Sequence, residues 1–153
     1  MERPNKDQYY LNIAGQVLTR GTCLRRNYGA IIVNRDEIVG TGYTGSPRGA
    51  GNCCDLGYCE RDLRGCKPGE NYELCKSVHA EMNAIISAGR KQCIDATIYV
   101  VGEERRTGNR IATMPCLLCQ RVIANAGITR VVINQGGTKD ANRVHPSSKC
   151  RDI

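Results

Sequence analysis

The chain has 153 residues, which is the size of a single domain. A composition of 41% hydrophobic and 24% charged residues excludes a disordered chain, and no apolar run reaches the roughly 18 residues that a membrane span needs. The net charge is +7, and the basic residues are scattered along the chain. The seven tyrosines are the only aromatic residues, which leaves little aromatic surface for stacking on the bases of single-stranded nucleic acids. These features fit a small phosphorylated ligand as well as a nucleic acid.

The first half of the chain contains a predicted helix, a predicted hairpin and a long irregular segment. Apolar residues at helical spacing predict a helix over residues 7–19. Two apolar, β-branched runs over 29–34 and 37–44 predict a hairpin. Residues 45–76 hold glycine, proline and five cysteines without periodicity. A loop this long in a compact domain is usually functional, disordered or held by something other than a core, and its cysteines favour the last.

The second half alternates helices and strands. Its predicted elements are a helix over 77–89, a strand over 96–101, a charged hairpin arm over 102–114, a helix from Pro115 to Gly127 and a strand over 129–134. Ser77 is expected to cap the first of these helices. The order predicts one α/β domain over 1–153, a three-layer α/β/α sandwich with a mixed sheet. Residues 45–76 would be a cysteine-rich insert and 135–153 a polar tail with little order.

Ten cysteines stand out in a chain of this composition. The N-terminus has no apolar segment behind its charged residues, so we expect no signal peptide and a cytoplasmic location. Thiols stay reduced there, which favours metal binding or catalysis over disulfides. With only two histidines in the chain, the other metal ligands must be thiolates or carboxylates.

Two predicted helix starts carry residues typical of a zinc site. One reads His79-Ala80-Glu81, and the other is the PCLLC segment that contains Cys116 and Cys119. Two thiolates one helical turn apart, at the positive end of a helix dipole, suit one tetrahedral zinc ion. One imidazole and two thiolates leave a position open, as in catalytic zinc sites, where water becomes a nucleophile near neutral pH.

Glu81 lies two residues beyond His79, near the metal without being a ligand. A carboxylate there can take a proton from water and pass it to a departing nitrogen. Each piece also has a simpler interpretation: a CxxC pair can be redox-active or structural, and Glu81 alone suits the first turn of any helix. Together the two motifs match the signature of zinc-dependent nucleobase deaminases.

The chain resembles the deoxycytidylate (dCMP) deaminases of the cytidine deaminase superfamily. The long cysteine-rich link before HAE favours this branch over tRNA adenosine deaminases, and His79 stands where free-cytidine deaminases usually have cysteine. The matching segments cover most of residues 9–134: TCLRRNYGAIIV (22–33), GTGYTGSPRG (40–49), NCCD (52–55), VHAEMNAI (78–85), ATIYVV (96–101) and PCLLCQRVIANAGITRVV (115–132).

The resemblance implies a cytidine deaminase-like fold and conversion of dCMP to dUMP and ammonia. It implies a zinc ion on His79, Cys116 and Cys119, with Glu81 as the catalytic proton carrier. Thr44 stands where the family usually has an asparagine that bonds the sugar, and a hydroxyl lacks the paired donor and acceptor of an amide. The candidate substrate-binding residues are Thr44, Ala80, Arg20, Arg26 and Arg48.

The resemblance also implies a second, structural zinc at the insert. Some dCMP deaminases hold such an ion with a cysteine after the first helix and one in the NCC segment, which here are Cys23 and Cys53. We add Cys75 and either Cys59 or Cys66 as the remaining candidates. The alternatives to a second zinc are free buried thiols and disulfides. We assign no role to His145, the second histidine of the chain.

Three rival functions remain open from the sequence. One is deamination of tRNA or single strands, which the charge permits although nucleic acid is the less expected partner. Another is deamination of dCTP or a modified cytosine nucleotide, which Thr44 leaves open. The third is an inactive relative that senses nucleotides. By resemblance we also expect a homo-oligomer, such as a hexamer, with dCTP and dTTP as effectors and no membrane partner.

Overall fold

A mixed β-sheet forms the centre of the computed structural model, which describes residues 2–112, 114–134 and, as backbone, 142–146. The strands are β1 (Arg26–Asn34), β2 (Glu37–Tyr43), β3 (Thr97–Glu104), β4 (Arg110–Ile111), β5 (Arg130–Asn134) and β6 (Asn142–Pro146). Their order is β2-β1-β3-β5-β6, with β4 paired to β3. The β3–β5 pair is parallel and the other pairs are antiparallel, so the predicted mixed sheet is confirmed.

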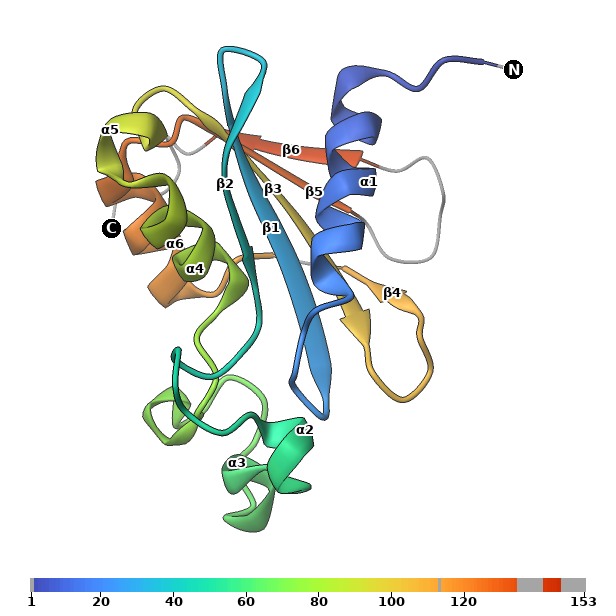
Figure 1. Ribbon diagram of the computed structural model, residues 1–153, viewed down its shortest axis with the longest axis vertical. Coiled ribbons are helices and arrows are strands. Elements are labelled where there is room, and N and C mark those ends of the chain that lie inside the picture. The colour runs from blue at the N-terminus through green and yellow to red at the C-terminus, as the bar shows by residue number, and fades with distance from the viewer. Residues whose placement is uncertain (1, 113, 135–141, 147–153) are drawn as a thin grey trace.

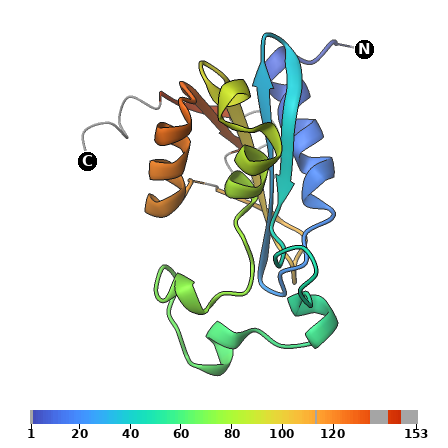
Figure 2. The same ribbon diagram turned by 60° about the vertical axis from the view of Figure 1, so that its left-hand side comes forward.

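Helices cover both faces of this sheet. The helices are α1 (Lys6–Leu18), α2 (Cys53–Leu56), α3 (Glu60–Leu63), α4 (Ala80–Ala88), α5 (Arg90–Cys93) and α6 (Leu117–Ala126), with a 3-10 turn η1 (Tyr72–Leu74). Figures 1 and 2 show α1 on one face of the sheet and α4, α5 and α6 on the other, so the predicted three layers are confirmed. Within the described residues, no helix is long and apolar enough to cross a membrane.

Two apolar clusters fill the spaces between these layers. The cluster under α4 and α6 contains Ile98, Val100 and Ile123, and the cluster under α1 contains Leu11 and Val132. Because successive side chains of a strand point to opposite faces, the same strands supply both clusters. The sheet is therefore buried on both sides and can serve as a rigid base for groups at its edge.

Glycine on β2 lets α4 lie unusually close to the sheet. A Cβ atom added to Gly42 would come within 2.3 Å of the Ala80 carbonyl oxygen and the Ala84 nitrogen, and one added to Gly40 within 2.6 Å of the Ala84 carbonyl oxygen. Such distances leave no room for a side chain. The close approach fixes the start of α4 against the sheet.

The helix boundaries differ from the predicted ones at two starts. His79, with an extended backbone, is the N-cap of α4, so the expected capping by Ser77 is wrong; Ser77 is instead buried near Cys53. The later helix has Cys116 as its N-cap and begins two residues after Pro115. Both N-caps are thus residues of the zinc motifs. The helix ends at Gly89 and Gly127 agree with the prediction.

The charged arm and the end of the chain form more sheet than expected. The arm extends β3 to Glu104 and returns as β4, which confirms a hairpin. Residues 142–146 form β6, antiparallel to β5, so the expectation of little order is wrong for this part of the tail. The rest of the predicted tail lies outside the described residues.

The insert over 45–76 is joined to the sheet at its two ends. Gly45 and Val78 exchange both backbone hydrogen bonds, at 3.3 and 2.8 Å, so the segment leaves and returns at one place. Between these ends lie only the short helices α2 and α3 and the turn η1, as the lack of periodicity predicts. The insert lies beyond one end of the sheet, at the bottom of Figure 1.

A carboxylate of α1 holds three elements of the fold together. Arg130 at the start of β5 donates to both Asp7 oxygens, at 2.8 and 2.6 Å, and the Tyr99 hydroxyl donates to Asp7 at 2.9 Å. Hydrogen bonding from Arg130 lowers the pKa of Asp7. A lowered pKa in the folded state stabilises the fold above the ordinary carboxyl pKa, and this stability is lost as the pH falls below it.

We therefore expect Asp7→Asn to lower the free energy of unfolding by about 1–2 kcal/mol at pH 7, after allowance for the partial exposure of the pair. Urea denaturation at pH 7 and near pH 3 measures this, and the difference between variant and parent should shrink at the lower pH. Glu60→Gln is the control, because its ion pair with Arg64 is a surface i,i+4 pair. An equal effect of the two variants would contradict the role of Asp7.

Candidate active site

Three metal-ligating side chains meet where α4 and α6 begin. The His79 Nδ1 atom lies 3.2 Å from the Cys119 Sγ atom and 3.5 Å from the Cys116 Sγ atom. Cys116 caps α6, and its sulfur accepts a hydrogen bond from the Cys119 backbone nitrogen at 3.4 Å. The two helix starts therefore converge on one point, as the sequence motifs predict.

His79, Cys116 and Cys119 form a preformed metal-binding group. One ligand atom from each, the His79 nitrogen and the two sulfurs, lies within 4.8 Å of the others. Among the described residues, no other group of three or more histidine, cysteine or acidic side chains meets this condition. Cys119 is buried, whereas His79 and Cys116 are half-buried and open toward solvent. The donor set of one imidazole and two thiols fits zinc with a free coordination position.

Hydrogen bonds within the group prepare one sulfur for metal binding. The Cys119 thiol, followed by His79, lowers the pKa of Cys116 to about 4, so Cys116 is a thiolate at neutral pH. Sharing that hydrogen bond raises the pKa of Cys119. The Cys116 sulfur in turn raises the pKa of His79. A thiolate is the form of cysteine that binds zinc, so Cys116 is ready to bind the metal, whereas Cys119 has to lose its proton on loading.

Glu81 places a carboxyl group directly beside the metal group. Its side chain is only 5% exposed and lies close to His79 and Cys119. Burial raises the pKa of Glu81. A buried carboxyl group beside a metal-binding group is well suited to taking up and releasing a proton.

A pocket opens next to His79, with a volume of about 120 Å³. Its lining includes Tyr28 and Thr44 from the hairpin and Tyr72 from the insert. Its cationic lining residues are Arg25, Arg26 and Arg61.

The predicted substrate residues divide into two groups in this structure. Thr44 and Arg26 line the pocket, and Ala80 is buried at the start of α4. Arg20 and Arg48 are exposed and do not line it. Sequence reasoning missed Arg25 and Arg61; Arg25 stands in the matched TCLRRNYG segment, whereas nothing in the sequence around Arg61 distinguishes it.

Thr44 already uses one of its hydrogen-bonding positions within the protein. Its hydroxyl oxygen accepts a hydrogen bond from the Tyr28 backbone nitrogen at 3.0 Å, and the Thr44 nitrogen donates to the Tyr28 carbonyl at 3.0 Å. The hydroxyl proton stays able to donate toward the pocket. A threonine held in this way can bond an acceptor on a ligand.

The matching sequence family accounts for this arrangement. Residues 4–135 match the family model described as the cytidine and deoxycytidylate deaminase zinc-binding region. The chain belongs to this family. Its membership and the His79, Cys116 and Cys119 group together identify zinc as the metal of this deaminase.

Two relatives that match most of the deaminase chain are named deoxycytidylate deaminase. The chain is 39% identical over 137 residues to the deoxycytidylate deaminase of Mycobacterium phage D29. This alignment covers 86% of this chain and 96% of the phage protein. The chain is 33% identical to the deoxycytidylate deaminase of Schizosaccharomyces pombe, over 92% of this chain but only 40% of the yeast protein. The chain thus spans nearly all of the phage protein and less than half of the yeast protein.

Solved structures show the same fold. The dCMP deaminase of cyanophage S-TIM5, in complex with dCMP and dUMP, aligns with a TM-score of 0.62 at 24% identity, over 87% of this chain and 83% of that one. A cytidine deaminase from Burkholderia pseudomallei aligns with a TM-score of 0.60 at 19% identity, over 93% of each chain. The predicted cytidine deaminase-like fold is confirmed.

Proposed function

We propose that this deaminase converts dCMP to dUMP and ammonia. The observation that carries the proposal is the buried Glu81 carboxyl beside the His79, Cys116 and Cys119 group, whose histidine also lines a pocket that contains three arginines. The 39% identity to a phage deoxycytidylate deaminase over most of both chains supports the choice of substrate.

The chemistry assigns separate roles to these residues. His79, Cys116 and Cys119 would hold the zinc ion, which when bound supplies a water nucleophile near neutral pH. Glu81 takes a proton from the attacking water and delivers it to the exocyclic nitrogen of the base. A C–O bond forms at C4 of cytosine and the C–N bond breaks. One proton of the water leaves with the ammonia, and the other is transferred to the ring nitrogen N3, which gives the uracil ring. Burial of Glu81 keeps this proton transfer away from bulk water.

The remaining lining residues would bind the nucleotide. Arg25 and Arg26 offer cations for the phosphate, since arginine matches phosphate geometry with a planar fork of donors. Thr44 can donate its hydroxyl proton to a sugar oxygen. The Ala80 region at the start of α4 would contact the edge of the pyrimidine. Arg20 and Arg48 keep no role in this pocket.

Ammonia release from the zinc-loaded protein tests this function. We expect fast turnover of dCMP and slow turnover of deoxycytidine, because the nucleoside lacks the phosphate. CMP, dCTP and a short tRNA-like hairpin complete the comparison at fixed salt. Preference for dCTP or for the hairpin would contradict the proposed substrate, and silence on all five with zinc bound would support a nucleotide sensor.

We also propose a second, structural zinc ion held by Cys23, Cys53, Cys59 and Cys75. Cys23, Cys59 and Cys75 line one pocket together with Ser77, and the buried Cys53 sulfur lies 4.0 Å from the Ser77 hydroxyl oxygen. Cys66 is the weaker candidate, because it does not line this pocket. Zinc would draw the four sulfurs together and give the insert the support that its small core does not provide.

Cys53→Ser should therefore lower the zinc content from two ions per chain to one. The insert should also exchange its amide hydrogens faster, whereas α4 and the sheet keep their protection. The neighbouring Cys54→Ser is a matched control, because Cys54 is exposed. A parent protein with only one zinc per chain would rule out the second site.

The assembly and regulation of the deaminase stay predictions from the resemblance. These are a homo-oligomer, such as a hexamer, and control by dCTP and dTTP. Light scattering and the effect of each triphosphate on dCMP turnover would test them.

A further inference from the structure

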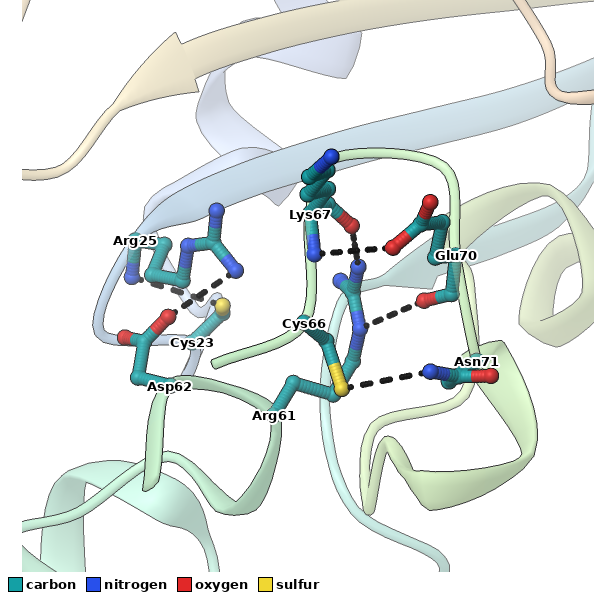
Figure 3. Close-up of polar contacts among 8 residues, drawn as sticks. All are labelled: Cys23, Arg25, Arg61, Asp62, Cys66, Lys67, Glu70 and Asn71. Carbon is teal, nitrogen blue, oxygen red and sulfur yellow. Dashed lines mark hydrogen bonds and ion pairs between the residues drawn. The ribbon is translucent and has the colours of Figure 1, made fainter. Parts of the chain in front are cut away.

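An arginine of the insert is buried without a carboxylate as its hydrogen-bond acceptor. Arg61 in α3 is only 8% exposed. Its Nε atom donates to the Glu70 carbonyl oxygen at 3.0 Å, and its Nη2 atom donates to the Lys67 carbonyl oxygen at 2.8 Å. Figure 3 shows the side chain reaching from α3 into the turn that these two residues close. The guanidinium therefore fixes this turn relative to α3.

The same guanidinium also contacts an aromatic ring of the pocket. Its central carbon lies 4.9 Å from the centre of the Tyr72 ring, a cation–π arrangement. The Tyr72 ring meets the His79 imidazole edge to face, with 5.2 Å between ring centres and 87° between planes. Arg61, Tyr72 and His79 thus form a series of direct contacts from the insert to the metal group.

All three side chains line the pocket described above. A shift of the Tyr72 ring would change both the shape of the pocket and the surroundings of the His79 imidazole. The helix that carries Arg61 is held in place on its other side, where Arg25 forms an ion pair with Asp62 at 3.0 Å, also drawn in Figure 3. Arg61 is therefore placed to transmit the position of the insert to the pocket.

We propose that Arg61 is a positioning residue of the deamination site: it holds the Tyr72 ring against His79 and so sets the wall that receives the substrate. The inference rests on the proposed function for its kinetic effect, and on geometry alone for its effect on His79. Arg61 acts through Tyr72 rather than as a ligand of the phosphate, because its Nε and Nη2 atoms already donate to carbonyl groups.

The histidine ring itself provides a readout that is independent of activity. The chain has two histidines, so the ring resonances of His79 in the zinc-loaded protein can be assigned with a His145→Gln variant. We expect Arg61→Met and Tyr72→Leu to shift the His79 ring protons in the same way, since both remove the aromatic ring from its position. Tyr72→Phe keeps the ring and Arg64→Met removes an exposed arginine of the same segment, so both should leave these resonances in place.

Kinetics with dCMP separates positioning from a loss of folded protein. We expect Arg61→Met to lower kcat/KM by roughly 10- to 100-fold, mostly through a higher KM. A general loss of folded protein would lower kcat and leave KM unchanged. Arg61→Lys keeps a cation but not the planar fork, and should recover part of the affinity for dCMP.

A double-mutant cycle decides whether Arg61 acts through Tyr72. The Arg61→Met, Tyr72→Leu double variant should be no worse than either single variant, because the two residues act as one unit. Additive losses, or unchanged His79 resonances in Arg61→Met, would overturn the proposal. Failure of the parent to turn over dCMP would contradict the proposed function instead, and the His79 resonances would still test the positioning role.

Discussion

Replacing Glu81 with glutamine should lower dCMP turnover by roughly 100- to 10,000-fold while zinc stays bound. Glutamine has the shape of glutamate but cannot take a proton from water or deliver one to a leaving nitrogen. Glu81 is not a member of the His79, Cys116 and Cys119 group, so the metal ligands are unchanged. The loss should therefore appear in kcat, with little change in the zinc content of the purified protein.

The folding of this variant can be checked independently. Because burial raises the pKa of Glu81, the charged carboxylate is unfavourable there in the metal-free protein, and Glu81→Gln should cause no loss of stability. Glu73→Gln is the control, since Glu73 is exposed on the insert. Turnover within tenfold of the parent, measured as ammonia release, would exclude Glu81 as the proton carrier.

The sequence predicts the metal group well because the motifs depend on local geometry. Two cysteines three residues apart at a helix start lie one turn apart on the same face of the helix. The sheet then needs only to bring the N-terminal ends of α4 and α6 to the same end of the domain. The alternation of strands and helices predicts that arrangement without any knowledge of individual contacts.

The lining of the pocket could not be predicted in the same way. Residues 45–76 lack periodicity, so nothing in the sequence indicates which of their side chains turn inward. Arg61 is buried because two distant carbonyls and a tyrosine surround it, which is a property of the folded insert. Arg20 and Arg48 lie in or beside matched segments, yet both side chains face solvent.

Errors at the element boundaries have a physical reason as well. Ser77 resembles a helix cap in the sequence, but the bridge of Val78 to Gly45 keeps the chain extended until His79. A β pairing across more than thirty residues overrides the local preference for a serine cap. Likewise, the polar composition of residues 142–146 gives no sign of β6, which forms by pairing with the buried strand β5.

Replacing Cys116 with alanine should remove the catalytic zinc and lower turnover by roughly 1,000-fold or more, because the metal supplies several kcal/mol of transition-state stabilisation. Cys116 is the ligand whose pKa is lowered to about 4, so it is the sulfur that is a thiolate before the metal arrives. Without it, only His79 and Cys119 would remain from the group. Zinc per chain, measured by atomic spectroscopy, should fall by one ion.

Alanine at this position also removes a helix cap, and the two effects can be separated. The Cys116 sulfur accepts a hydrogen bond from the Cys119 nitrogen, so alanine should also lower the free energy of unfolding by about 0.5–2 kcal/mol. Cys116→Ser keeps a capping oxygen but lacks the thiolate, so it should lose zinc and activity while the metal-free protein stays as stable as the parent. Serine and alanine variants that both retain the full zinc content would exclude Cys116 as a ligand. Equal losses of stability in the two metal-free variants would contradict its role as the cap of α6.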